Sequence, residues 1–135
     1  LSNFAKAGQA SLHNQCYWQL HDYLGLGLGA TGFIRPRRYE NTTDRTAYLR
    51  GEWEASSETL SQREQMSETV FMGLRQTKGL SCKRFFKLYG QSFTSVYQEV
   101  LENLVEKGLL EIDQAYCRLT QQGRALGNEV FMNFI

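Results

Sequence analysis

The sequence lacks an excess of charge of either sign and any long apolar run. Among its 135 residues, 15 Lys and Arg stand against 14 Asp and Glu, so no net electrostatic field attracts nucleic acid or an anionic membrane. No apolar run approaches the roughly 20 residues that a transmembrane helix requires, and the first residues do not form a secretory signal pattern. We therefore expect no nucleic-acid partner and no membrane span.

Cysteines are few, and they are far apart: Cys16, Cys82 and Cys117. An odd number at such separations argues against a disulfide framework and favours a reducing cytoplasm. The same spacing excludes a zinc or iron–sulfur cluster built from the cysteines of this chain alone. Because the chain starts at Leu1 without an initiator methionine, we expect it to be a piece of a longer protein. Its length fits one domain plus a fragment of another.

From Ser61 onward, helix and turn signals follow one another in a regular order. Ser61 and Glu64 form a capping box ahead of an apolar helical stripe. A short helix between Ser81 and Gly90 comes next, and residues 94–107 then carry five apolar side chains on one helical face. Five phenylalanines fall within or beside these stripes and are expected in the core: Phe71, Phe85, Phe86, Phe131 and Phe134.

A hairpin over residues 109–119 and a last helix after Thr120 complete a winged-helix order. The expected fold class is therefore α+β, mostly α, with a small β-hairpin. In a DNA-binding protein of this order, the helix at 94–107 would face the phosphates. This helix has three glutamates and one lysine, and the hairpin sets Arg118 against two acidic residues. Because phosphate would repel such a surface, we interpret the domain as a structural or protein-contact module.

The first 40 residues are rich in glycine and aromatic side chains and show no sustained helical period. The stretch "DYLGLGLGATGFI", residues 22–34, contains the spacing Gly-x-Gly-x-x-Gly, but Pro36 and crowded arginines follow where a dinucleotide site requires a helix. The alternation of Leu and Gly at 24–29 instead predicts a strand with one bare face. Such a face is typical of close approach by a ligand or by another backbone, and the alternative is a tight barrel corner.

Several motifs in combination resemble a known family. They are "SNFAKAG", "HNQCYW", "DYLGLGLGATGF" and "RYEN", followed by "FMGLRQTKGLS", "LVEKGLLE" and "RLTQQGRALGNEVF". Together they resemble the C-terminal part of the oxygen-independent coproporphyrinogen III oxidase-like radical S-adenosylmethionine (SAM) proteins, in the branch with a His-Asn-x-x-Tyr-Trp motif that is regarded as haem chaperones. The resemblance covers essentially the whole chain.

The resemblance implies a longer parent protein that acts in haem metabolism. Its N-terminal radical SAM domain would hold a [4Fe–4S] cluster in a Cys-x-x-x-Cys-x-x-Cys motif, which has no counterpart in this sequence. The parent would either oxidise coproporphyrinogen III or, as HNQCYW favours, bind haem and deliver it to an acceptor protein. Residues 1–40 would be the end of the radical SAM barrel, 41–60 a connector with a short helix, and 61–135 an accessory winged-helix-like domain, without catalytic activity of its own.

The resemblance also implies that His13, Asn14, Tyr17 and Trp18 handle haem or another tetrapyrrole. Imidazole is a common axial ligand of haem iron, and aromatic rings can stack on a porphyrin. Cys16, three residues after His13, could share its helical face and offer a thiolate ligand instead. The alternative is that His13 and Trp18 only pack this segment against the missing barrel.

One dense group of basic residues occurs, Arg35, Arg37 and Arg38. Guanidinium groups would suit the propionates of a porphyrin, and a solvated loop is the simpler interpretation. Many members of the family carry a histidine where this chain has Thr31, so no ligand role can be transferred from that histidine. The second hypothesis is a protein-interaction module that docks a haem acceptor or a second subunit through the surface of the helix at 94–107.

Overall fold

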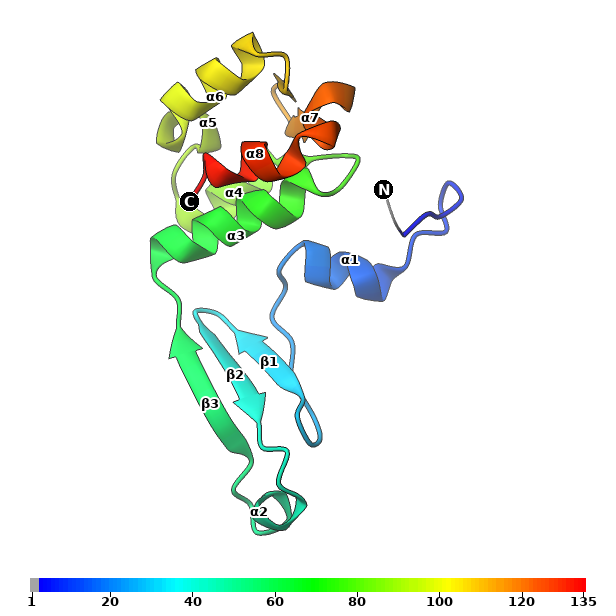
Figure 1. Cartoon of the computed structure of the whole chain (residues 1–135), viewed down its shortest axis with the longest axis vertical. Coiled ribbons are helices and arrows are strands. Elements are labelled where there is room, and N and C mark those ends of the chain that lie inside the picture. Colours follow the sequence, from blue (N-terminus) through cyan, green and yellow to red (C-terminus); the bar gives the residue numbers. More distant parts are fainter. Residues whose placement is uncertain (1–2) are drawn as a thin grey trace. The chain divides into compact units, whose positions relative to one another are not determined.

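The computed structural model describes residues 3–135 and divides the chain into two compact units (Figure 1). The first unit comprises the chain up to Leu20 together with Met66–Ile135, and the second comprises His21–Gln65. Leu1 and Ser2, which begin the predicted barrel fragment and the SNFAKAG motif, lie outside the described residues. Within residues 3–135, no helix is long and apolar enough to cross a bilayer.

The first unit is mostly helical and carries a small antiparallel sheet. Its helices are α1 (Leu12–Trp18), α3 (Gln62–Leu74, from Met66 onward), α4 (Cys82–Tyr89), α5 (Phe93–Val96), α6 (Gln98–Glu106), α7 (Gln121–Ala125) and α8 (Gly127–Met132). Its strands are β4 (Leu80–Ser81), β5 (Leu110–Ile112) and β6 (Tyr116–Leu119), paired antiparallel in the order β4-β6-β5. The order from α3 to β6 is that of a winged-helix domain, so the predicted α+β class with a small hairpin is confirmed.

Sequence signals at the helix ends are confirmed in the first unit and at its boundary. The Ser61 backbone N–H donates to Glu64 Oε2 at 2.7 Å, and the Glu64 backbone N–H donates to Ser61 Oγ at 3.3 Å, which is the predicted capping box. Ser81 caps α4 through its hydroxyl, and Gly90 ends α4 in the left-handed conformation at φ 67°. The Thr120 hydroxyl caps α7.

Two segments that the sequence predicts as single helices are each broken in two. Residues 94–107 fall within α5 and α6, which Tyr97 separates, and the last helix is divided into α7 and α8 at Leu126. The Tyr97 ring contacts the rings of Phe93 and Phe134 at centroid distances of 5.5 and 5.2 Å. This aromatic packing favours the break at Tyr97, although the apolar period continues through it.

The core of the first unit is formed by apolar side chains from α3, α4, α5, α6, α8 and the small sheet. Val70, Phe85 and Val130 have no exposed surface. Thr69, buried among them, has its hydroxyl oxygen 2.6 Å from that of Tyr89, so each satisfies the other in the apolar interior. This core makes the first unit a rigid support for whatever its surface binds.

The second unit is a three-stranded antiparallel sheet with one short helix. Strands β1 (Thr31–Ile34), β2 (Arg37–Asn41) and β3 (Glu54–Thr59) lie in sequence order, and α2 (Arg45–Leu49) connects β2 with β3 (Figure 1). The predicted connector at 41–60 therefore contains both α2 and β3. All residues of β3 are exposed, so this strand lacks the alternation of apolar and polar residues by which sequence reasoning finds strands.

The strand predicted at residues 24–29 is wrong, because these residues form a loop beside the sheet. The loop is held by polar side chains. The Asn41 side-chain amide, buried in the sheet, donates to the carbonyl oxygens of Gly25 and Gly27 at 3.1 and 2.9 Å. The Tyr39 hydroxyl accepts from the Gly25 N–H at 3.0 Å, and the Tyr48 hydroxyl accepts from the Gly27 N–H at 3.1 Å.

Close approach explains two of the glycines in this stretch. A Cβ at Gly25 would lie 2.4 Å from the carbonyl oxygen of Thr31, and a Cβ at Gly32 would lie 2.1 Å from the Tyr39 ring. Gly27 has a φ of +101°, which side chains rarely allow. The groups that approach these two glycines, Thr31 and Tyr39, belong to the chain itself.

Candidate functional site

The HNQCYW motif forms helix α1, which the sequence period did not predict. Ser11 caps the helix by accepting the Asn14 backbone N–H at 3.3 Å. The helix has seven residues and none of them is buried. Isolated helices shorter than about 12 residues are marginal in water, so α1 depends on contacts with the rest of its unit.

Three side chains hold the C-terminal end of α1. The Arg75 guanidinium lies over the Trp18 ring, 5.4 Å from its centroid. The Gln76 side-chain amide donates to the Trp18 carbonyl oxygen at 3.3 Å, and Arg84 donates to the carbonyl oxygen of Gln19, which follows the helix. Backbone carbonyls at the C-terminal end of a helix lack intrahelical partners. Gln76 and Arg84 supply hydrogen-bond donors to two of these carbonyls, and Arg75 fixes the ring of Trp18.

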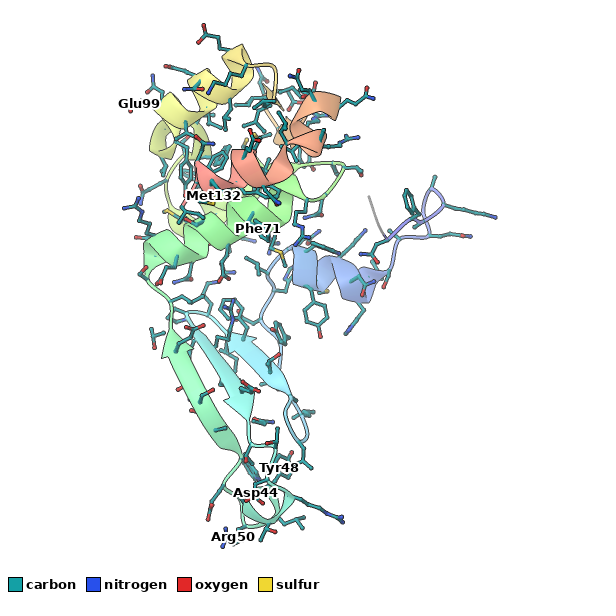
Figure 2. The ribbon with its side chains drawn as sticks, in the orientation of Figure 1. Asp44, Tyr48, Arg50, Phe71, Glu99 and Met132 are labelled. Carbon is teal, nitrogen blue, oxygen red and sulfur yellow. The ribbon has the colours of Figure 1, made fainter. Side chains whose placement is uncertain are left out.

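Phe71 of α3, labelled in Figure 2, contacts the same Arg75 guanidinium that lies over the Trp18 ring. Its ring centroid is 4.9 Å from the Arg75 Cζ and 4.8 Å from the ring of Phe131, which packs against the core. Phe71 is 38% exposed, and Phe86 is 57% exposed. The prediction that both belong to the core is therefore wrong, since Phe71 lies at the surface under Arg75 and Phe86 faces solvent.

The candidate ligand residues of α1 are exposed. His13, Asn14, Cys16 and Tyr17 all belong to the exposed class. The rings of His13 and Tyr17, one helical turn apart, meet edge to face with centroids 5.0 Å apart. Cys16 is a free thiol, and it lies three residues after His13 on the same helix, so both point to neighbouring parts of one helical surface. Trp18 is half-buried and contacts Arg75, and a role of its ring in haem binding stays a prediction.

This donor set suits haem more than a bare metal ion. Among residues 3–135, no group of three or more His, Cys, Asp and Glu side chains is arranged to hold a metal ion. Haem iron takes four ligands from the porphyrin and needs one axial donor, such as imidazole or thiolate, from the protein. His13 or Cys16 can supply that donor from α1, and Tyr17 adds an aromatic ring beside it.

The other two cysteines are poor ligands, because burial changes their acidity. Burial raises the pKa of Cys117 to about 12, and it also raises the pKa of Cys82 above the ordinary value of a thiol. Both stay protonated at neutral pH, and a protonated thiol is neither a nucleophile nor a metal ligand. Cys16 is the exposed cysteine of the chain, so any thiolate ligand would come from HNQCYW.

The three arginines belong to the second unit, and each has a partner there. Arg37 pairs with Glu54, and the hydrogen bond from Arg37 is the main cause that lowers the pKa of that carboxyl below its ordinary value. Arg38 pairs with Glu58 at 3.5 Å, and the Arg35 guanidinium lies 5.7 Å from the centroid of a phenylalanine ring of β1. A contact of these arginines with porphyrin propionates stays a prediction, and it would have to compete with these ion pairs.

Sequence reasoning missed the residues that hold α1. Gln76 and Arg84 lie 58 and 65 positions away from the carbonyls that they bind, so no local pattern connects them with the motif. One signal was present, because Arg75 and Gln76 both fall within "FMGLRQTKGLS", one of the motifs that carry the family resemblance. The joint occurrence of the two motifs marks a contact in the structure.

Comparisons with known proteins find a domain family and relatives that match the chain over its whole length. Residues 60–126 match the family model of the HemN C-terminal domain. Over its whole length the chain is 41% identical to the heme chaperone HemW of Bacillus subtilis (strain 168) across 140 residues, and 35% identical to the heme chaperone HemW of Lactococcus lactis subsp. lactis (strain IL1403) across 138 residues. The chain spans 37% and 36% of these two proteins.

The fold is similar to that of a solved structure, coproporphyrinogen III oxidase (HemN) from Escherichia coli, which is described as a radical SAM enzyme. The TM-score is 0.61 at 21% sequence identity, and the match covers 84% of this chain and 28% of that chain. At this identity the similarity concerns the fold alone. It supports the mixed α+β architecture derived above.

Proposed function

The chain belongs to the family of the HemN C-terminal domain, and from this membership we propose that it forms the haem-binding C-terminal part of a longer radical SAM protein. We further propose that the longer protein binds haem in order to deliver it, and that oxidation of coproporphyrinogen III is the alternative activity. The two relatives support delivery, since both are heme chaperones. The sequence motifs that resemble radical SAM proteins support a radical SAM parent, and the chain spans 37% and 36% of the two relatives, which supports a longer protein.

The observation that carries the proposal is the geometry of α1. One end of the helix is fixed by Arg75, Gln76 and Arg84, while His13 and Cys16 are open to solvent. A donor on a supported helix is oriented before the ligand arrives, which reduces the entropy that binding costs. Bound haem would supply an iron with a free axial position. His13 would offer its neutral imidazole nitrogen to that position, with the Cys16 thiolate as the competing donor.

The rest of the proposed protein would hold the [4Fe–4S] cluster and S-adenosylmethionine in its N-terminal radical SAM domain. The surface of the second unit has features that contact with such a domain would cover. Leu24, Leu26 and Leu28 are 65%, 83% and 48% exposed, and β3 presents an exposed sheet edge. Exposed apolar side chains and free strand edges are features that proteins usually cover. Three free cysteines support a reducing cytoplasm as the location.

A haem titration followed by absorbance tests the proposal. We expect the unmodified chain to show a saturable one-to-one shift of the Soret band, and His13→Ala to lose it, because the axial nitrogen is gone. The chain has one other histidine, so His21→Ala is the matched control and should titrate like the unmodified chain. Loss in Cys16→Ala instead of His13→Ala would assign the ligand to the thiolate.

Two results would contradict haem ligation by α1. One is a titration that no substitution in HNQCYW changes. The other is binding that does not saturate at one haem per chain, which would indicate unspecific adsorption of a hydrophobic ligand on exposed aromatic side chains. In the first case the haem site would lie outside HNQCYW, and in the second it would have to be sought in the rest of the longer protein.

A further inference from the structure

An apolar groove lies along α6 of the first unit, and nothing in the proposed haem site uses it. Its volume is about 530 Å³. The apolar part of its lining consists of Leu101, Val105 and Ile112. Leu101 is buried and belongs to the core, whereas Val105 is 42% exposed. The groove therefore connects the interior of the domain with solvent through apolar side chains, which is typical of a surface that receives an apolar partner.

The polar lining of the groove is acidic. Glu102 and Glu106 line it one helical turn apart, together with Gln98, whose side-chain amide donates to Glu102 Oε1 at 3.0 Å. Among the described residues that line this groove, none is basic. Lys107, the one cation within residues 94–107, lines a different pocket. The groove is thus bordered by negative charge that the cation of its own helix does not offset.

We propose that this groove docks a basic amphipathic helix of a partner protein. Leu101 and Val105 are four residues apart on α6, as are Glu102 and Glu106, so an apolar row and an acidic row run side by side along the helix. A helix presents apolar and charged side chains with the same spacing. Its apolar stripe would fill the groove, and lysines or arginines beside that stripe would pair with the two glutamates.

The inference is independent of haem binding, because the groove residues are on α5, α6 and β5 and the candidate ligands are on α1. It also agrees with the acidic character that argues against DNA binding for this winged-helix-like domain. Complementary charge mainly sets the rate of encounter and the choice of partner. The surface that would repel a phosphate backbone would attract a cationic peptide.

A peptide titration by fluorescence anisotropy tests the proposal on the full 135-residue chain. The probe is a labelled helical peptide of leucines and lysines with its leucines at positions i, i+3, i+4 and i+7. We expect saturable binding, weakened at least tenfold by the double change Glu102→Lys and Glu106→Lys. The matched control is Glu99→Lys, the same charge reversal on the same helix at a residue outside the groove lining (Glu99 is labelled in Figure 2). Its affinity should change by less than about threefold, because Glu99 does not line the groove and solvent and salt screen exposed charges that lie outside a contact.

Four outcomes would overturn the proposal. If Glu99→Lys weakens binding as much as the double change of Glu102 and Glu106 does, the peptide responds to the overall charge of α6 and not to the groove. If a peptide with glutamates in place of its lysines binds equally well, the attraction is unspecific apolar adhesion. If Val105→Ser leaves the affinity unchanged, the apolar lining is not the contact. If the chain self-associates in sedimentation experiments and Val105→Ser abolishes this, the occupant is a second copy.

Discussion

Replacing Arg75 by alanine tests whether α1 is folded because its end is anchored. The guanidinium of Arg75 lies 5.4 Å from the ring centroid of Trp18 and 4.9 Å from that of Phe71. A cation–π contact at a partly exposed site contributes about 0.5–1 kcal/mol. Of the two contacts, the one with Trp18 joins Arg75 to α1, so the substitution should remove about 0.5–1 kcal/mol from the local stability of α1. None of the seven residues of α1 is buried, so little other apolar contact would compensate for the loss.

Amide hydrogen exchange measures this local stability directly. The N–H groups of Gln15 and Gln19 donate to the carbonyls of Ser11 and Gln15 at 3.0 and 2.9 Å, so they report on the two ends of α1. A loss of about 0.5–1 kcal/mol corresponds to about 2–5-fold faster exchange where opening is rapid and reversible. Amides of β6, in the core, should exchange as before, because Arg75 contributes nothing to that core.

Arg124→Ala on α7 is the control for the removal of an arginine from the same unit, and it should leave exchange in α1 unchanged. Haem affinity, if His13 is the ligand, should fall in Arg75→Ala by the factor by which the folded fraction of α1 falls, because only the folded helix presents the imidazole in a fixed orientation. Unchanged exchange at Gln15 and Gln19 in Arg75→Ala would refute the reasoning that the anchor stabilises α1.

Two further predictions concern the core of the first unit. Phe85→Ala should lower the free energy of unfolding by about 3–5 kcal/mol, because Phe85 is 0% exposed. Phe86→Ala, at a side chain that is 57% exposed, should change it by less than about 1 kcal/mol. Thermal or urea unfolding measures both losses, and equal losses would mean that the packing of these two residues is misassigned. Alkylation at neutral pH, followed by mass spectrometry, should modify Cys16 first, Cys82 slowly and Cys117 only after unfolding. The reason is that burial raises the pKa of the thiols of Cys82 and Cys117. Rapid modification of Cys117 in the native chain would contradict its burial.

The parts of the fold that the sequence predicts correctly are those with local signals. The capping box at Ser61 and Glu64, the left-handed glycine at Gly90 and the cap at Thr120 act within a few residues, so their spacing alone places the helix ends. The hairpin of β5 and β6 is equally local. These signals define the winged-helix order, and they are sufficient for the fold class.

Other elements depend on contacts that no local pattern contains. Strand β3 is exposed at every residue, so its place in the sheet comes from backbone pairing with β2 and not from an apolar face. The breaks at Tyr97 and Leu126 interrupt continuous apolar periods. The alternation of leucine and glycine at 24–29 imitates a strand, because the glycines are required by the close approach of Thr31 and by a left-handed backbone, as at Gly27.

For the candidate site, the residue types came from the resemblance, and the arrangement came from the structure. "HNQCYW" and "FMGLRQTKGLS" are separate motifs in the sequence, and Arg75 and Gln76 of the second hold Trp18 of the first. "RYEN" and the glycine stretch are related in the same way, because Asn41 binds the carbonyl oxygens of Gly25 and Gly27. In each pair, the two motifs supply the two sides of one contact in the structure.

The proposed haem ligands of α1 therefore depend on residues outside this helix. A peptide with the residues of α1 would contain every proposed ligand, but at seven residues it would not hold a helix in water. His13 and Cys16 would then sample many orientations, and the binding of haem would have to bear the entropy of ordering them. In the chain, that ordering is supplied by Arg75 and Gln76, which follow α3, and by Arg84 of α4. The winged-helix-like domain, whose groove along α6 is lined by two glutamates, is thereby the support on which the proposed haem ligand is presented.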